Sequence, residues 1–291
     1  MAKVSYYYRV VLFLSFMLAG LATEGMSAPS PLAMVTDLQG QAILIRDGND
    51  APCDILSYLQ DGDELKSLRA SVVTIVYLQN GKEYRLENES HIRISKTGVD
   101  VLDNSNIKSR VLKTIKESGL QFETIHNYGQ GTIIFRGIEK RKKITLLEPV
   151  DTKVASSSPV FKWESGLTTK EFKFTLLNYE SETIFSSKTT NNYYPLPQNI
   201  HLNDEEPYSW TVESQGDSAG TISSTGNFRV IEKAKRDLVK KLKPDSNANF
   251  SERVIYANFL EHLGLNQLAK GYWQALQRER PESISLKQTT R

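Results

Sequence analysis

Short strands are predicted over residues 32–105, where apolar and polar positions alternate between clusters of turn residues. Residues 72–78 (VVTIVYL) are apolar at consecutive positions, which is typical of a central strand covered on both faces. Asn80-Gly81 follows at once and is a strong hairpin signal. Residues 38–46 are interpreted as one strand, kinked at its glycine. This pattern predicts a compact all-β domain.

The pattern changes over residues 106–143, which we interpret as a linker. Apolar residues in 107–117 recur at the spacing of one helical face, so a helix is predicted there. Residues 132–135 (TIIF) predict a short strand. The basic run 140–143 is interpreted as a solvated hinge, with contact to an anionic surface as the alternative.

Alternation returns over residues 144–231, now with aromatic side chains at the apolar positions. The alternating positions are Phe161, Trp163, Phe172, Phe174, Leu176, Tyr208, Trp210, Val212, Phe228 and Val230. Regularly spaced strands separated by turns predict an immunoglobulin-like β-sandwich. The alternation directs Trp163 and Trp210 into its core; an exposed sugar-binding platform is the alternative.

Helical periodicity replaces alternation in residues 232–283. Residues 232–242 are predicted to form a basic connector helix, with binding to anionic lipid or wall polymer as the alternative. A helical hairpin follows within 250–283. Residues 284–291 are interpreted as a disordered tail.

The hairpin has recognisable start and stop signals. Asn249 or Ser251 is expected to cap its first helix, and Gly264 fits the position just beyond that helix. Asn266 is expected to cap the second helix, and Pro281 follows the end of that helix.

A single helical hairpin cannot bury its apolar face alone. That face must dock on another part of this chain, on a second copy or on a partner protein. The candidate protein-binding residues are Leu260, Leu268, Tyr272 and Trp273. Docking within the chain is the alternative.

The first 28 residues have the pattern of a signal peptide. Lys3 and Arg9 precede the apolar run 10–22. This run is shorter than a membrane span, and small residues follow it. No cysteine lies nearby for a lipid anchor. We predict a Sec-type signal peptide over 1–28 and a periplasmic or secreted protein. An uncleaved anchor is the alternative and would be the chain's one contact with a membrane.

Charge and composition exclude several classes of protein. The chain has 291 residues with 36 Lys+Arg and 34 Asp+Glu, and this balance argues against a nucleic-acid binder. The single cysteine, Cys53, excludes an internal disulfide and a Cys-only zinc site. We expect it to be a small buried hydrophobic residue rather than half of an intermolecular disulfide.

Signatures of catalysis are missing from the sequence. It contains no HExxH, CxxC, GxSxG or GxxxxGK motif. The four histidines, His91, His126, His201 and His262, do not have the spacing of metal ligands. We therefore expect no enzymatic activity, no cofactor and no metal site.

Three short motifs punctuate the first β-rich region: V-T-x-x-x-G-x-A at 35–42, D-G-D-E-L at 61–65 and N-G-K-x-Y-x-L at 80–86. With these motifs, the region resembles a FecR-like domain. The resemblance implies an all-β extracytoplasmic module used in sensing, protein contact or envelope association, without catalytic residues. The sequence lacks the membrane segment and cytoplasmic tail of the family's signalling members, which puts sigma-factor regulation in doubt.

Two further resemblances concern the rest of the chain. Ser158-Pro159-x-Phe161-x-Trp163 and Pro207-Tyr208-x-Trp210-x-Val212 resemble bacterial fibronectin type III-like modules, which act as spacers or protein-contact units. Ala269-x-x-x-Trp273 followed by Pro281 resembles the second half of a tetratricopeptide repeat.

The expected fold class is mainly β: a FecR-like all-β domain plus an immunoglobulin-like sandwich, with a C-terminal helical hairpin. The expected function is that of a non-enzymatic envelope protein that binds another protein as an adaptor or regulator. The alternative is a module that binds peptidoglycan or another glycan.

Overall fold

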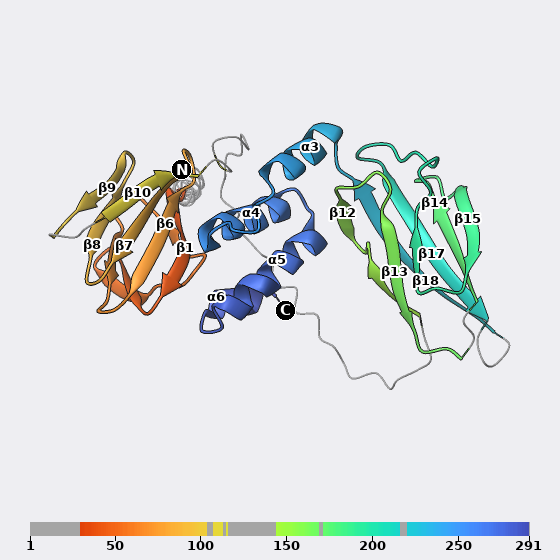
Figure 1. Cartoon of the computed structure of the whole chain (residues 1–291), viewed down its shortest axis with the longest axis horizontal. Helices are drawn as coiled ribbons and strands as arrows, with labels where there is room; N and C mark the ends of the chain where they lie inside the picture. The colour runs from red at the N-terminus through yellow and green to blue at the C-terminus, as the bar shows by residue number, and fades with distance from the viewer. Residues whose placement is uncertain are drawn as a thin grey trace, which may run out of the picture. The chain divides into compact units, whose positions relative to one another are not determined.

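The computed structural model describes residues 30–103, 107–112, 115, 144–168, 171–215 and 220–290. Strands hold most of the described residues up to residue 230, and helices follow (Figure 1). The predicted fold class is confirmed: the protein is mainly β with a C-terminal helical region. The predicted signal peptide, the strand over 132–135 and the basic run 140–143 lie outside the described residues. None of the described helices has the length and hydropathy needed to cross a membrane.

Ten strands form the N-terminal β-domain as two five-stranded antiparallel sheets. The first sheet contains, in spatial order, β10 (Ile107–Val111), β7 (Lys82–Glu87), β6 (Val72–Tyr77), β1 (Ala33–Gln39) and β4 (Tyr58–Leu59). The second contains β3 (Asn49–Pro52), β2 (Ala42–Arg46), β5 (Glu64–Ser67), β8 (His91–Ser95) and β9 (Gly98–Val101). Both sheets contribute side chains to one hydrophobic core.

The central position of β6 agrees with its sequence. β6 pairs with β1 on one side and β7 on the other, and five of its six side chains are buried. The predicted hairpin after it is confirmed, with Gly81 at a φ of +71°. A side chain at this glycine would also press against the backbone of Leu112, so both the turn and the close approach favour glycine.

The single strand expected over 38–46 is divided between the two sheets. β1 ends at Gln39 in the first sheet, and β2 begins at Ala42 in the second. Gly40 adopts a φ of +88° between them, a conformation that L side chains rarely take. The glycine therefore turns a corner instead of kinking one strand.

The helix expected over 107–117 is wrong at its first five residues, which form the edge strand β10 paired with β7. A short apolar spacing does not separate a helix from a strand, and the free edge of β7 supplies backbone partners. Leu112 and Ile115 are nevertheless buried in the core of the β-domain.

Eight strands form the central sandwich, the predicted immunoglobulin-like module. One sheet has the order β11 (Ile144–Glu148), β13 (Val160–Ser165) and β16 (Tyr193–Pro195). The other has the order β12 (Thr152–Val154), β18 (Thr221–Val230), β17 (Pro207–Gln215), β14 (Phe172–Leu177) and β15 (Thr183–Thr189). Its strands are antiparallel except for the parallel pair β12–β18.

Aromatic side chains fill the core of this sandwich, as their alternation predicts. Trp163 is 1% exposed and Trp210 is fully buried, so the core position of both tryptophans is confirmed. The ring of Phe161 lies 5.1 Å from that of Trp210. The Trp210 indole nitrogen donates a hydrogen bond of 2.7 Å to the carbonyl oxygen of Pro149, which satisfies its buried polar group.

Four described helices complete the chain: α3 (Lys233–Leu242), α4 (Phe250–His262), α5 (Asn266–Glu279) and α6 (Ile284–Thr289). We call them the helical layer. Asn249 caps α4 through a reciprocal pair with Glu252, as one of the two candidate caps. The expected cap at Asn266 is wrong, because α5 begins at this residue without a side-chain cap. The expected disordered tail is also corrected: 284–289 form α6, in which Leu286 is fully buried.

The helical layer belongs to the core of the N-terminal β-domain, although the whole central sandwich separates the two in sequence. Buried residues of α3 to α6 and of β1, β2, β4, β5, β6, β7 and β8 form one hydrophobic cluster. The core of the central sandwich is a separate cluster. The sandwich is therefore inserted between a β-domain and the helices that cover it.

Candidate functional site

The four residues predicted to bind a partner lie on α4 and α5, and only part of this set reaches solvent. Leu260 is fully buried and Trp273 is 1% exposed, both within the core shared with the β-domain. Leu268 is 45% exposed, and Tyr272 is partly buried. The apolar face of the hairpin therefore docks largely within the chain, which was the alternative to a partner.

Helix α4 explains this docking. Nine of its residues are buried, on every side of the helix: Phe250, Ser251, Val254, Ile255, Tyr256, Ala257, Asn258, Phe259 and Leu260. A helix that is apolar all round lies inside a core rather than at its surface. α4 packs against β1 and also against α5, so it is the middle element of the unit formed by the N-terminal β-domain and the helical layer (Figure 1).

Polar contacts fix how the helical layer meets β1. The hydroxyl oxygens of Thr36 and Ser251 are 2.8 Å apart inside the interface. Arg280 donates two hydrogen bonds, of 2.9 and 3.0 Å, to the carboxylate of Asp37, which is only 8% exposed. The Arg280 guanidinium also lies 4.6 Å from the centre of the Phe250 ring. A bidentate, largely buried pair of this kind specifies one orientation of the helices on the sheet.

Two large apolar side chains of the described helices are exposed: Ile284 on α6, at 66%, and Leu268 on α5, at 45%, where Leu268 forms a small strip with Tyr272. Leu268 and Tyr272 are one helical turn apart, so their side chains lie on the same face. The Tyr272 ring packs against Tyr256 at 5.0 Å, and burial raises the pKa of its hydroxyl group. Lys270 is two positions away from both residues and therefore lies on the other side of α5, while exposed Glu279 lies on their side, seven positions after Tyr272. The strip is therefore a short apolar surface on a helix that carries exposed charges of both signs.

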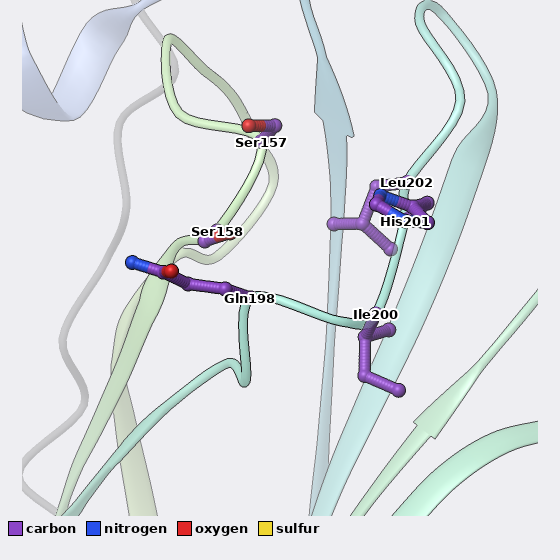
Figure 2. Close-up of a pocket in the computed structure, with 6 residues that line it drawn as sticks. All are labelled: Ser157, Ser158, Gln198, Ile200, His201 and Leu202. Carbon is purple, nitrogen blue, oxygen red and sulfur yellow. The ribbon is translucent and has the colours of Figure 1, made fainter.

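The central sandwich carries a polar pocket of about 360 Å³ (Figure 2). It is lined by Ser157, Ser158, Gln198, Ile200, His201 and Leu202. Figure 2 shows that Gln198 extends away from His201, so the polar groups do not converge on one point. None of the lining residues is a carboxylate, and the pocket therefore lacks the acid–base pair that hydrolysis of a glycosidic bond requires.

A second pocket, of about 410 Å³, lies beside the β2–β3 hairpin and includes Cys53, Gln41, Asp50 and Leu68. Cys53 is 7% exposed, which confirms that it is buried. Burial raises the pKa of its thiol to about 11, so the reactive thiolate form is scarce at neutral pH.

In the described part of the chain, no three or more His, Cys, Asp or Glu side chains form a group that could hold a metal ion. His91 lies 2.7 Å from Glu64, which also accepts a hydrogen bond from Arg93. The hydrogen bonds from Arg93 and then His91 lower the pKa of the Glu64 carboxyl group. His91, Glu64 and Arg93 lie partly exposed on the sheet, and they line neither of the two pockets described above. His201 lines the polar pocket, His262 is exposed at the end of α4, and His126 lies outside the described residues.

Sequence reasoning missed the residues that hold the helical layer in place. Asp37 and Arg280 are 243 positions apart, and no local pattern connects them. The one available signal is an aspartate in β1, where four of the seven residues are apolar, since a buried carboxylate requires a cationic partner.

No protein-family model and no curated protein matches the chain. Among solved structures, it is similar to β-glucuronidase 3 of Bacteroides uniformis, with 9% identity and a TM-score of 0.24 over 69% of this chain and 24% of that chain. It is also similar to the β-glucuronidase of Ruminococcus gnavus, with 9% identity and a TM-score of 0.21 over 69% of this chain and 33% of that one. The chain thus spans about a quarter to a third of these enzymes, and likeness at these TM-scores supports no statement about fold or activity.

Proposed function

We propose that this chain is a non-enzymatic protein of the bacterial envelope that binds another protein as an adaptor or regulator. The N-terminal targeting pattern and the resemblance to FecR-like and fibronectin type III-like modules support this location and this class of function. Most of the apolar face of the hairpin is buried within the chain, so the proposed contact surface is only the part that stays exposed.

The observation that carries the proposal is the exposed strip on α5. Leu268 keeps 45% of its surface exposed although most apolar residues of the hairpin are buried in the chain's own core. The anchors of protein interfaces are enriched in Tyr, and Tyr272 lies beside Leu268. Because Leu268 and Tyr272 share one face of α5, the expected partner offers an apolar pocket.

A site-specific photo-crosslinker tests this surface. The crosslinking residue replaces Leu268 in the full-length chain, and a matched chain carries it at Thr225, an exposed position of β18. Cells expressing each chain are irradiated, and the captured molecules are identified by mass spectrometry. We expect one protein captured from position 268 and absent from position 225. Deletion of the hairpin is unsuitable, because its buried residues complete the core of the β-domain.

Capture of no protein at position 268 would contradict the adaptor function. A second candidate then applies, the binding of peptidoglycan or another glycan at the polar pocket. The hydroxyl groups of Ser157 and Ser158, with the amide of Gln198 and the imidazole of His201, can form hydrogen bonds with sugar hydroxyls. Sedimentation with purified cell wall that is lost in Gln198→Ala and His201→Ala variants would support this candidate.

A further inference from the structure

The four sheets have eight edge strands among the described residues, and they differ in how well their edges are protected. An edge strand presents unpaired N–H and C=O groups, and proteins protect such edges with short strands, prolines or charged side chains. β4, β12 and β16 have two or three residues, β3 ends at Pro52, β9 carries Asp100, β10 carries Lys108 and Arg110, and β11 carries Glu148.

β15 is the longest of these edges. It has seven residues (TIFSSKT), no proline and one charged side chain, Lys188. Among the described residues it has one neighbouring strand, β14, and none of them forms a strand at its other edge (Figure 1). Natural proteins normally protect an edge that is this long and carries so little charge. Its lack of protection therefore indicates that another strand pairs with it.

The aromatic surface next to this edge supports the same conclusion. The ring of Phe185 on β15 lies 5.7 Å from that of Tyr194 on β16, and Phe185 is only partly buried. Tyr193, also on β16, is 50% exposed. A strand added to β15 would cover the remaining exposed part of Phe185, which favours its addition through burial of apolar surface.

The register of β15 limits what can pair with it. Ile184 is the extra residue of a bulge, and 185–189 form the regular stretch opposite β14. In an antiparallel pair, residues directly opposite each other must lie on the same face of the sheet. A second copy of 185–189 satisfies this rule when the two-fold axis passes through Ser187, the middle residue. Ser186 then lies opposite Lys188 of the second copy, and Phe185 lies opposite Thr189 of the second copy.

We propose that β15 pairs antiparallel with β15 of a second copy of this chain, about a two-fold axis at Ser187, so that one continuous sheet crosses both sandwiches. No like charges meet across this axis, because each Lys188 lies opposite a serine. The Lys188 amine also lies 2.7 Å from the Glu171 carboxylate, which partly neutralises the charge of Lys188 at the interface. This proposal does not rest on the adaptor function, since it uses an edge of the central sandwich and not the strip on α5.

Substitutions at Ser186 test the proposal through effects of opposite sign. Ser186→Lys places a lysine opposite Lys188 of the second copy twice in each dimer, whereas Ser186→Glu places a glutamate there. We expect Ser186→Lys to weaken the dimer about fivefold and Ser186→Glu to strengthen it by about the same factor. The dimer dissociation constant of the full-length chain is measured by sedimentation velocity over a concentration series.

The matched controls are Thr225→Lys and Thr225→Glu, which change an exposed position of β18, an inner strand of the same sheet. They are expected to leave the dissociation constant unchanged, and thermal melting followed by circular dichroism verifies that every variant folds. A wild-type chain that stays monomeric at all concentrations would overturn the proposal, and an extended segment of another protein would then be the candidate for this edge. Equal dissociation constants for the two Ser186 variants would overturn it as well.

Discussion

The N-terminal β-domain and the central sandwich are both two-sheet β structures, but they complete their cores differently. The central sandwich closes its own core with aromatic side chains from its two sheets. The first sheet of the β-domain is buried on both faces along β1 and β6, and helices from the other end of the chain cover its outer face. The sequence records part of this difference: the central sandwich alternates apolar and polar positions, whereas β6 is almost wholly apolar and β1 carries the buried polar residues Thr36 and Asp37.

The largest expected effect comes from removing the helical layer. In a chain that ends at residue 232, the outer face of β1 and β6 is left open to water. We expect the β-domain to lose cooperative folding, because a large apolar area is exposed, while the central sandwich stays folded. Hydrogen exchange measured by mass spectrometry, resolved by segment, separates the two outcomes. Protection of β1 and β6 at the level of the full chain would contradict the dependence.

A matched pair of tryptophan substitutions separates the two cores. Trp273→Ala is expected to destabilise the β-domain with its helices by about 3–5 kcal/mol, and Trp210→Ala the central sandwich by a similar amount. Calorimetry should show that each substitution lowers one unfolding transition and leaves the other in place. If Trp273→Ala lowered both transitions equally, the two cores would not be independent.

The next largest effect on the free energy of unfolding is expected from breaking the Asp37–Arg280 pair. Asp37→Asn leaves the guanidinium of Arg280 in a largely buried position without its anion, which should cost about 3 kcal/mol in the free energy of unfolding. A double-mutant cycle with Arg280→Gln isolates the coupling between the two side chains. Additive effects of the two substitutions would show that the pair does not hold the helical layer.

Glu279→Gln is a control for the buried pair, since Glu279 forms an exposed ion pair with Arg253. This substitution is expected to cost under about 1 kcal/mol. Chemical denaturation at neutral pH compares it with Asp37→Asn.

The same glutamate gives the smallest expected effect, a dependence on pH. The hydrogen bond from Arg253 lowers the pKa of the Glu279 carboxyl group. Its stabilising contribution is therefore complete above its unfolded pKa of about 4.3 and is lost as the pH falls through the lower folded value. Denaturation curves at acidic pH should show a smaller decline for Glu279→Gln than for the wild-type chain. An identical decline would contradict the assignment.

Much of this fold could be predicted from local patterns. Strand β6, the turn at Gly81, the buried Trp163 and Trp210, and the cap at Asn249 are all indicated by patterns of neighbouring residues, although the two tryptophans pack against residues far away in the chain. Each of these features could be predicted from a short segment of the sequence, and the structure confirms each one.

The errors concern long-range contacts. β10 is a strand because the edge of β7 accepts it, and α6 is ordered because Leu286 reaches a core built by residues far away. Of the candidate site, Leu268 remains at the surface while Leu260 and Trp273 do not, because the sheet that covers them belongs to the opposite end of the chain. A window of sequence contains no information on which distant surface an amphipathic helix will meet.

The insertion of the sandwich has a consequence for how the protein is made. Thr36 meets Ser251, 215 residues later, so a chain delivered from its N-terminus presents the β-domain long before its cover arrives. During that interval the sandwich can fold, and the uncovered sheet is open to chaperones or to premature association. A translation product cut short within the sandwich would carry a permanently open sheet. The β-domain can therefore complete its core only after the helical layer has been delivered.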